Sequence, residues 1–478
     1  METQEKIKTH DKDVKAIQNQ LLKWKEGEIS SVPDPSNSHT MRKKPYALKA
    51  PPLSSRKLDR ILGIDKARQT IRVEPYVTQD QWAEYCIREG FIPPVVAEFK
   101  KITVGGGIMG SSLESSSHRW GQMNDSAMSY ELLLGDGSVI HASPEENPEL
   151  FYGVSGSYGA FARILSAEFP LLVAKPFVNV SSFTFDSIER GIQHLMELCS
   201  EASRPEYIEA LVIDRNRFKI IVGEMSDTAK YEQFSLKSSG SMWYHQKVIH
   251  DSTPFSMTLY DYLFRYDRGA FWMGTYALWG SLLTRFWFEG TPFMPQMLLN
   301  KLKSFPKGHY NTPKYPNALF RSLSGWMMDS ADLYKWLHWK RENWFEKNFV
   351  VQDFYLPTSK TTEFIHYALD TTEIKPLWIC PCKGTKTPQL FSPQVNEEPL
   401  LFDVGVYGFP IENHSAEEAT RLLEKKTYEL SGKKMFYSWN FMTEEELFTH
   451  YDKASYDNLR ELGKAEGVFP PFTQKTAL

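Results

Sequence analysis

The chain has 478 residues, of which 41% are hydrophobic and 24% are charged, as in soluble globular proteins and unlike disordered ones. Its length predicts two or three domains with a core that needs neither a disulfide nor a metal. A formal net charge of −4, with no basic tract, argues against nucleic-acid binding. Four cysteines are too few for a secreted disulfide scaffold.

The N-terminus and the longest uncharged run bear on membrane association. Residues 1–30 are polar and of mixed charge, so the sequence predicts no signal peptide. The uncharged run at 269–284 has 16 residues, fewer than the roughly 20 that span a bilayer. We therefore expect no transmembrane helix, and we expect this run to form the wall of an apolar pocket or a peripheral membrane contact.

The first elements follow from hydrophobic spacing and turn residues. Residues 11–24 predict an amphipathic helix, and residues 30–55, rich in Pro, Ser and Asn, predict a loop. Short strands or turns are expected within 56–64 and 70–75. The apolar positions of the helix are Val14, Ile17, Leu21 and Leu22.

A second helix and a hairpin have clear boundary signals. Thr78 is an expected N-cap, and Gly90 ends the helix that follows it. Pro93 and Pro94 force the next residues into an extended conformation. The sequence Gly-Asp-Gly at 135–137, between two β-branched apolar runs, predicts a β-hairpin.

A glycine-rich stretch between these elements is the most unusual part of the chain. Gly105, Gly107 and Gly110 fit the G-x-G-x-x-G pattern, and Glu131 follows about twenty residues later. The serine-rich sequence and the hairpin that follow argue against a Rossmann unit, which needs a helix and a parallel strand there. Adjacent glycines can adopt positive φ and form an anion-binding nest of amides, and nearby serines add hydroxyl donors. A nucleotide loop and a plain turn both remain open on this evidence.

A family resemblance favours the nucleotide loop. The stretches TVGGGIMGSSLESSSHRWG and YELLLGDGSVIHASPEENPELFYGVSGSYGAF resemble the flavin-binding domain of the vanillyl-alcohol oxidase and p-cresol methylhydroxylase superfamily. Within it the chain is most similar to the delta-24 sterol reductase (24-dehydrocholesterol reductase, Diminuto-like) family. Further sequence motifs that resemble that family are VEPYVTQDQW, VVQDFYLP, PLWICP, DVGVYGFP and YDNLRELG.

The resemblance implies an α+β fold with a two-subdomain FAD-binding domain of the vanillyl-alcohol oxidase type and an α+β substrate domain. We expect the FAD-binding domain (PCMH-type) at 1–175 and the substrate domain at 176–435. Residues 436–478 would form a C-terminal segment that returns to the flavin domain.

The same resemblance implies the FAD-binding residues. The stretch that would carry the FAD pyrophosphate, with its last three residues beside it, comprises Thr103, Val104, Gly105, Gly106, Gly107, Ile108, Met109, Gly110, Ser111, Ser112, Leu113, Glu114, Ser115, Ser116, Ser117 and His118. His118 could bond the flavin or its phosphates, or it could be a structural histidine. Glu131 could contact a ribose or stabilise the fold.

The first phosphate loop of the superfamily corresponds to residues 36–40 and contains His39. His39 could attach FAD covalently or be an exposed loop histidine; we expect non-covalent FAD. Two other positions are candidates for polar groups near the flavin ring, Tyr407 between two glycines and Asn440 in an expected aromatic strand at 436–441.

Other chemistry has little support in the sequence. Cys380 and Cys382 are spaced too tightly for a common zinc pair, so we expect a structural role and no metal. No nucleophile elbow or Walker loop is present. The aromatic segment 259–288 could line a concave site for a flat apolar ligand or pack as ordinary core.

The expected function is reduction of a sterol-like side-chain double bond by an FAD-dependent oxidoreductase, with NADPH as the possible electron donor. NADPH would bind on the same side of the flavin as the substrate, because the sequence contains no recognisable second nucleotide-binding motif. The alternatives are an FAD-linked oxidase or dehydrogenase of a secondary metabolite and a flavin-free lipid-binding relative. We expect the protein in the cytoplasm or peripherally on the endoplasmic reticulum membrane.

Overall fold

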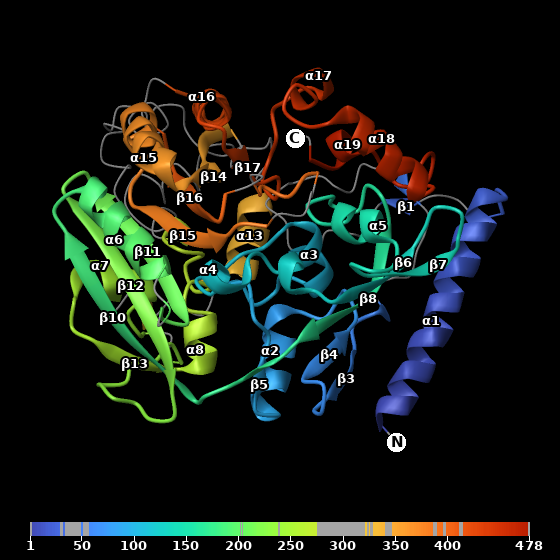
Figure 1. Ribbon diagram of the computed structural model, residues 1–478, viewed down its shortest axis with the longest axis horizontal. Helices are drawn as coiled ribbons and strands as arrows, with labels where there is room; N and C mark the ends of the chain where they lie inside the picture. The colour runs from blue at the N-terminus through green and yellow to red at the C-terminus, as the bar shows by residue number, and fades with distance from the viewer. Residues whose placement is uncertain are drawn as a thin grey trace, which may run out of the picture. The chain divides into compact units, whose positions relative to one another are not determined.

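The computed structural model divides the chain into two compact units (Figure 1). Unit 1 comprises Met1–Ala174, Lys383–Pro399 and Met435–Leu478, and unit 2 comprises Lys175–Cys382 and Leu400–Lys434. The structure describes residues 2–28, 32–33, 49–50, 57–200, 202, 204–237, 240–274, 321–322, 325, 328–339, 347–385, 390–394, 398–410 and 414–476.

Unit 1 contains a five-stranded sheet in the order β3-β4-β8-β6-β7. Its strands are β3 (Ile61–Asp65), β4 (Thr70–Val73), β6 (Ser129–Leu133), β7 (Val139–Ala142) and β8 (Arg163–Pro170). Two-stranded sheets are formed by β1 (Val32–Pro33) with β2 (Lys49–Ala50), and by β5 (Phe91–Ile92) with β9 (Leu172–Val173).

The local signals that predicted these elements are confirmed. Helix α2 (Gln79–Arg88) begins after Thr78, whose backbone N–H donates to the Gln81 side chain at 3.0 Å. Strands β6 and β7 pair antiparallel, and Gly137 adopts φ 93° in the turn between them, a conformation that favours glycine.

The N-terminal helix is longer than expected. Helix α1 (Glu2–Lys25) buries Val14, Ile17 and Leu21, whereas Leu22 is 42% exposed. The buried side chains form an apolar cluster whose other members include Leu58, Leu133, Leu165, Ala465, Val468 and Phe469. The cluster therefore joins α1 both to the sheet and to the C-terminal segment of unit 1.

A buried polar contact fixes the same helix. His10 has no exposed side-chain surface, and its two ring nitrogens bond Glu74 and Glu131, each at 2.7 Å. Burial alone would lower the pKa of His10, but hydrogen bonds to Glu131 and Glu74 outweigh it and raise the pKa to about 9. Arg60 also bonds Glu74, and Arg72 also bonds Glu131. His10 is therefore a cation held between two carboxylates.

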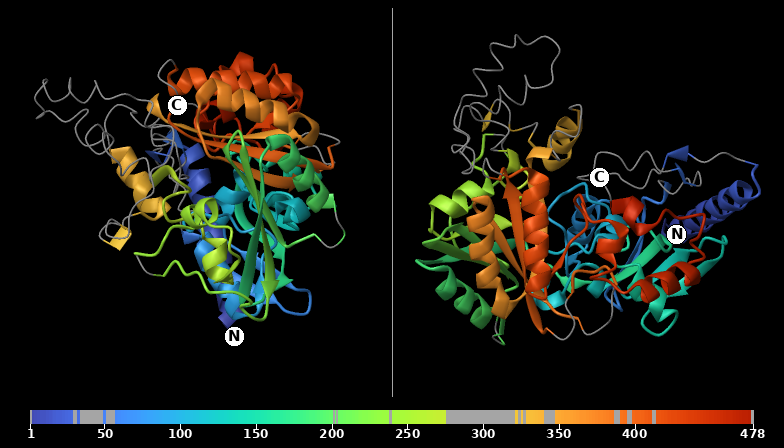
Figure 2. Two further views of the ribbon diagram at one scale, coloured as in Figure 1. Left: turned by 90° about the vertical axis from the view of Figure 1, so that its left-hand side faces the viewer. Right: turned by 90° about the horizontal axis from the view of Figure 1, so that it is seen from above.

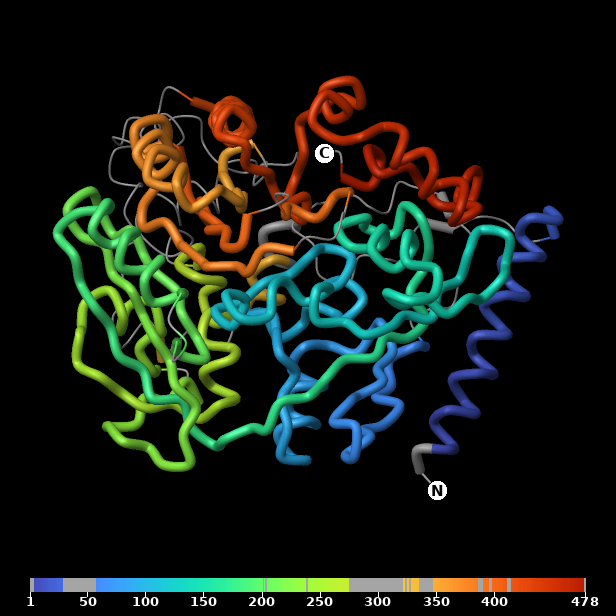
Figure 3. Tube along the Cα trace, viewed as in Figure 1, coloured from blue at the N-terminus to red at the C-terminus, as the bar shows by residue number. Residues whose placement is uncertain are grey.

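The second and third chain segments of unit 1 pack with the first. The tube trace shows the C-terminal segment passing over α5 (Pro148–Gly153) (Figure 3). The buried Arg460 donates to the carbonyl oxygens of Ala160 and Phe469, each at 2.9 Å. The helices of this segment are α17 (Glu444–Leu447), α18 (Lys453–Leu462) and α19 (Phe472–Thr476).

Two features of these segments differ from the expectations. The sequence analysis did not anticipate residues 383–399 in unit 1. The aromatic strand expected at 436–441 is wrong: this stretch is irregular, with bends at 437–438 and a single bridge residue at 440. A strand needs a hydrogen-bonded partner strand, and within the described residues no strand pairs with this stretch. The Phe436 ring packs 5.0 Å from that of Phe472 and 5.5 Å from that of Tyr451.

Unit 2 is built on an eight-stranded sheet in the order β13-β10-β12-β11-β15-β16-β14-β17. Its strands are β10 (Phe177–Phe185), β11 (Tyr207–Asp214), β12 (Arg217–Ser226), β13 (Phe255–Thr258), β14 (Val350–Pro357), β15 (Leu377–Lys383), β16 (Leu400–Gly408) and β17 (Lys433–Lys434).

Helices α6 (Ile188–Ser200), α15 (Thr358–Thr372) and α16 (Ala416–Glu429) cover one face of this sheet (Figure 2). The core between them includes Val350, Phe354, Phe364, Val404 and Leu423. Because strand side chains alternate between faces, Asp353 and Tyr407 lie on the face opposite to these helices. The α+β prediction is confirmed.

The remaining helices of the described ranges have ten residues or fewer. They are α3 (Val104–Met109), α4 (Ser117–Trp120), the 3₁₀ turn η3 (Asn124–Ser126), α7 (Tyr244–His250), α8 (Leu259–Leu263) and α13 (Ser330–Trp339). Within the described ranges, no helix has the length and apolarity needed to cross a membrane. Residues 275–284 of the uncharged run lie outside those ranges.

We predict that His10 makes the stability of the protein sensitive to alkaline pH. Its pKa is raised in the folded state from 6.5 to about 9, so its stabilising contribution is fully present below pH 6.5 and is lost as pH rises through about 9. Chemical denaturation of the wild type and of His10→Gln should differ by on the order of 2 kcal/mol at the acidic end and converge at the alkaline end. Parallel pH profiles of the two proteins would contradict this.

Candidate functional site

The expected FAD loop begins with a short helix that contains its three adjacent glycines. Thr103 is the N-cap of α3, and its hydroxyl oxygen accepts from the backbone N–H of Gly106 at 3.1 Å. Packing requires one of the glycines and favours a second: a Cβ on Gly105 would lie 2.7 Å from Cβ of the rigid Pro75, and one on Gly107 would lie 2.5 Å from Sδ of Met123, whose side chain would have to move. These glycines allow the helix to approach its neighbours closely.

The expectation of a nest of glycine amides with positive φ is wrong. Gly105, Gly106 and Gly107 are helical, and none of them has positive φ. Their amides bond within the protein, to the Pro75 carbonyl at 2.9 Å, the Thr103 hydroxyl at 3.1 Å and the Thr103 carbonyl at 2.8 Å. The helix itself uses these donors, so a phosphate must be held by other groups.

Two features of the loop do fit a bound cofactor. Gly106 is exposed, and a Cβ there would meet only the Thr103 hydroxyl, at 3.0 Å, so packing does not explain this glycine. Ser111 is 1% exposed and adopts φ 56°, a left-handed conformation that is uncommon for serine. Its hydroxyl has no hydrogen-bond partner within the described part of the chain. A ligand oxygen at this hydroxyl would satisfy an otherwise unmatched buried donor.

The last residues of the expected loop bond to their own surroundings. The Ser116 hydroxyl donates to the Pro94 carbonyl at 2.8 Å, and the Ser117 hydroxyl accepts from the Glu114 backbone N–H at 2.9 Å. Nδ1 of the buried His118 lies 2.9 Å from the Ser115 carbonyl. These contacts hold the loop beyond Ser112 in shape.

Glu131 has partners that fit the fold-stabilising alternative. Besides His10 and Arg72, its carboxylate accepts from the Ser166 hydroxyl at 3.0 Å. Burial would raise the pKa of Glu131, but the hydrogen bond and charge of His10 and the charge of Arg72 lower it. It is an ionised carboxylate in a structural network.

Tyr407 in unit 2 is paired with a carboxylate that the sequence analysis missed. Its hydroxyl donates to Oδ1 of Asp353 at 2.5 Å, and both side chains are buried. In the antiparallel register Asp353 lies opposite Gly405. A Cβ on Gly405 would lie 2.4 Å from the Tyr407 hydroxyl oxygen and 2.9 Å from Oδ1 of Asp353, so glycine is needed between the two groups.

Aromatic residues surround this pair. The Trp272 indole N–H donates to the Tyr407 carbonyl at 2.9 Å, and the Phe271 ring lies 5.1 Å from the Tyr407 ring. Phe271 is also 5.1 Å from the Trp378 ring. The part of the aromatic segment that the structure describes, 259–274, therefore packs onto the strand that carries Tyr407.

A buried ion pair anchors the same aromatic group. Arg265 and Glu209 are fully buried and lie 3.1 Å apart. Glu209 also accepts from the Tyr244 hydroxyl at 3.1 Å and from the Trp378 indole N–H at 2.8 Å. With its polar atoms matched, this network fixes the aromatic side chains in one arrangement.

The other candidates have plainer surroundings. Asn440 lies in unit 1, where its side-chain oxygen accepts from the Met442 backbone N–H at 3.3 Å in a local turn. His39 lies outside the described residues. Cys380 and Cys382 are buried free thiols in β15, and no cluster of metal-ligating residues occurs in the ranges that the structure describes.

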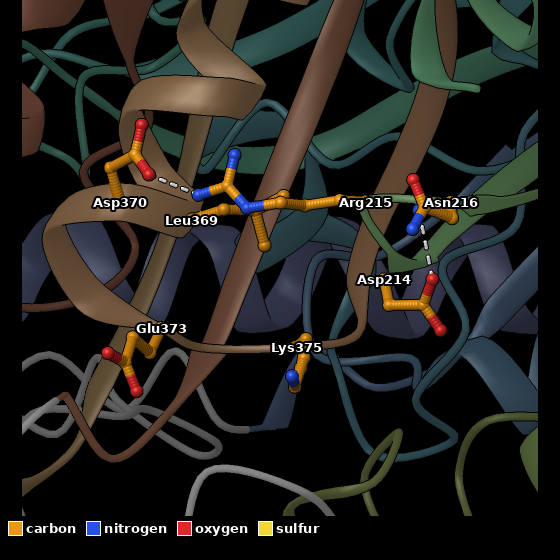
Figure 4. A pocket seen from close by; sticks show the side chains of 7 residues that line it. All are labelled: Asp214, Arg215, Asn216, Leu369, Asp370, Glu373 and Lys375. Carbon is orange, nitrogen blue, oxygen red and sulfur yellow. Dashed lines mark hydrogen bonds and ion pairs between the residues drawn. The ribbon is translucent and has the colours of Figure 1, made fainter.

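A pocket of about 640 Å³ on unit 2 is unrelated to these groups (Figure 4). Arg215 and Asp370 form an ion pair at its wall. A lining this rich in charge does not suit an apolar substrate. The lining residues are Asp214, Arg215, Asn216, Leu369, Asp370, Glu373 and Lys375.

Sequence reasoning could have found one of the missed residues. His10 precedes Val14, Ile17 and Leu21 at helical spacing, so it belongs to the buried face of the same helix. Asp353 gave no such signal, because its partner is 54 residues away and only strand register brings the two together.

Comparisons with known proteins identify the cofactor. Residues 38–143 match an FAD binding domain. The chain is 28% identical to Delta(24)-sterol reductase of Homo sapiens over 98% of its own length and 86% of the relative's, and 24% identical to that of Pisum sativum over 97% and 83%. A cytokinin dehydrogenase of Oryza sativa subsp. indica is 32% identical, over 27% of this chain and 24% of its own length.

These findings confirm the resemblance. The chain is related to the Delta(24)-sterol reductases and carries an FAD binding domain, so FAD is its cofactor. The matched region includes Gly106 and Ser111, the two loop positions whose surroundings fit a ligand.

We predict that Gly106→Asp abolishes flavin retention without unfolding the protein. Position 106 is the third residue of a short helix, where a carboxylate interacts favourably with the helix N-terminus, so the charge should not destabilise the apoprotein. The same charge would repel a phosphate at the exposed face. Flavin absorbance per protein after gel filtration measures retention.

Gly106→Asn is the matched control, because it adds nearly the same volume without a charge. We expect it to retain clearly more flavin than Gly106→Asp. A folded Gly106→Asp protein with a full complement of flavin would contradict the loop assignment.

Proposed function

We propose, from its relation to the Delta(24)-sterol reductases, that this chain is an FAD-dependent oxidoreductase that reduces a carbon–carbon double bond in the side chain of a sterol-like substrate. The main support is the 28% identity to the human enzyme across 98% of the chain. This similarity extends through both units. Similarity restricted to the FAD binding domain would support the cofactor alone.

The proposed chemistry combines a hydride and a proton. Reduced FAD, when bound, supplies a hydride to one alkene carbon, and NADPH is the proposed electron donor, leaving as NADP⁺. The proton for the other carbon comes from a protein acid. The double bond becomes a single bond with one new hydrogen on each carbon.

Tyr407 is the proposed proton donor. A phenol can protonate a carbon centre when it is oriented and kept from bulk water, and Tyr407 is 3% exposed. Its hydroxyl lies over Gly405 and donates to Asp353, so in the proposed step this hydrogen bond breaks and the proton turns to the alkene carbon. Solvent restores the proton to Tyr407 after each turnover. We propose a structural role for Asn440, because its side chain is engaged in a local turn.

The alternative of an FAD-linked oxidase or dehydrogenase has narrower support. The likeness to cytokinin dehydrogenase covers 27% of the chain, so it bears on a shared part and not on the direction of electron flow. A flavin-free lipid-binding relative is disfavoured by the FAD binding domain.

Two finer points complete the proposal. FAD is held without a covalent bond, so acid precipitation should release all flavin into the supernatant. Yellow colour that stays in the pellet, and that is lost in His39→Ala, would instead make His39 an attachment site.

The protein acts in the cytoplasm or peripherally on the endoplasmic reticulum membrane. An alkaline carbonate wash should then release any membrane-bound protein, and resistance to extraction would contradict this location.

We predict that the two half-reactions separate in an anaerobic spectrophotometer. NADPH should bleach the flavin absorbance, and a sterol with a side-chain double bond should restore it. The saturated sterol is the control and should leave the flavin reduced. If only oxygen restores the absorbance, the oxidase alternative replaces the reductase.

Tyr407→Phe should leave the bleaching by NADPH unchanged and slow reoxidation by the alkene on the order of 100-fold, since it removes only the proton donor. Asp353→Asn should slow the same step to a smaller extent. Equal reoxidation rates in Tyr407→Phe and the wild type would exclude Tyr407 as the acid.

A further inference from the structure

Ser111 is the one residue of the stretch 103–118 with a positive φ, and its carbonyl is bonded by Gln122, which is bonded in turn by Ser392. We infer that Gln122 and Ser392 are positioning residues of the flavin site, which hold Ser111 in its left-handed conformation so that its hydroxyl can donate to a phosphate oxygen of FAD. This inference rests on the proposed binding of FAD at the loop 103–115.

The contacts form a direct chain. The Gln122 side-chain amide donates to the Ser111 carbonyl at 3.1 Å, and its amide oxygen accepts from the Ser392 hydroxyl at 2.6 Å. Gln122 and Ser392 are completely buried. A buried glutamine bonded at both ends of its amide has one orientation, so it fixes the peptide plane that follows Ser111.

The position of Ser392 is itself tightly determined. Phe391, the preceding residue, stacks on Phe472 with ring centroids 3.7 Å apart. The backbone of Phe391 is also approached closely by Gly156, which has φ 69°. A Cβ on Gly156 would lie 2.5 Å from the Phe391 carbonyl carbon. Gln394 then donates to Asp125 at 3.2 Å, and Asp125 accepts from the Gln122 backbone N–H at 2.8 Å. The segment 390–394 is thus fastened on both sides of Ser392.

The chemistry of Ser111 points to a ligand. A left-handed serine is unfavourable unless its surroundings impose the conformation, and such residues gather at functional sites. Its buried hydroxyl has no partner among the described residues, while the neighbouring glycine amides are used within the protein. Phosphate oxygens are strong acceptors and FAD carries them, so a phosphate oxygen would match this buried hydroxyl.

The matched FAD binding domain covers residues 38–143, so Ser392 lies outside it. The inference therefore adds to the flavin site a residue from the segment between β15 and β16, the two strands of unit 2 that flank it in the chain.

A double-mutant cycle on FAD affinity tests this. Apoprotein is titrated with FAD, and binding is followed by the quenching of flavin fluorescence. Ser111→Gly keeps the left-handed backbone and removes the hydroxyl, so it should raise the Kd about tenfold. Ser392→Ala should raise the Kd by a similar factor in the wild-type background and by less than twofold in the Ser111→Gly background, because Ser392 acts through Ser111.

Controls separate positioning from general damage. Ser330→Ala removes an equally buried hydroxyl that bonds Asp267 in unit 2, and it should leave the Kd unchanged. Gln122→Met removes the amide at similar volume and should reproduce the effect of Ser392→Ala, which provides a second variant if one fails to fold. Thermal unfolding of each apoprotein shows whether it is folded.

A wild-type Kd in folded Ser392→Ala and Gln122→Met would overturn the inference, and so would an equal effect of Ser392→Ala in both backgrounds. Failure of the proposed FAD site looks different: the wild-type apoprotein would then not bind FAD, or Ser111→Gly would bind it with the wild-type Kd. Failure of the proposed alkene reduction would leave all of these FAD affinities unchanged.

Discussion

The stacking of Phe391 on Phe472 is the contact on which the architecture of unit 1 depends. The two rings are nearly parallel, with centroids 3.7 Å apart, and they come from the second and third chain segments of the unit. Phe161, from the first segment, lies parallel to Phe391 at 6.3 Å. Three stretches that are far apart in the sequence therefore share one aromatic cluster, whose burial offsets the entropy lost in bringing them together.

The loop that fits FAD is shaped by these long-range contacts as much as by its own glycines. Gly105 and Gly107 permit close packing against Pro75 and Met123, whereas Ser111 is reached through Gln122 from Ser392, beside Phe391. In unit 2 the corresponding constraint is strand register, which places Asp353 and Tyr407 on one face and requires glycine at 405. In both units a buried hydroxyl, that of Ser111 or of Tyr407, is therefore positioned by residues that are distant in the sequence.

Local signals predicted a large part of this structure. Thr78, Gly90 and the glycines at 135 and 137 define a helix and a hairpin through short-range chemistry, and both form where expected. Sequence motifs of the family indicated the FAD binding domain. They could not show that the glycine amides donate their hydrogen bonds within the protein, in and around a short helix. Asp353, Ser392 and the role of His10 depend on contacts across many residues, which spacing in one sequence does not reveal.

Hydrogen–deuterium exchange of the purified protein, with and without FAD, tests the central claim that the loop and the segment around Phe391 form one flavin site. Backbone amides exchange more slowly where a ligand stabilises the structure. The account predicts added protection on FAD binding in peptides covering 103–118 and also in the peptide containing residues 390–394. Protection confined to other parts of unit 1, with both of these peptides unchanged, would contradict it.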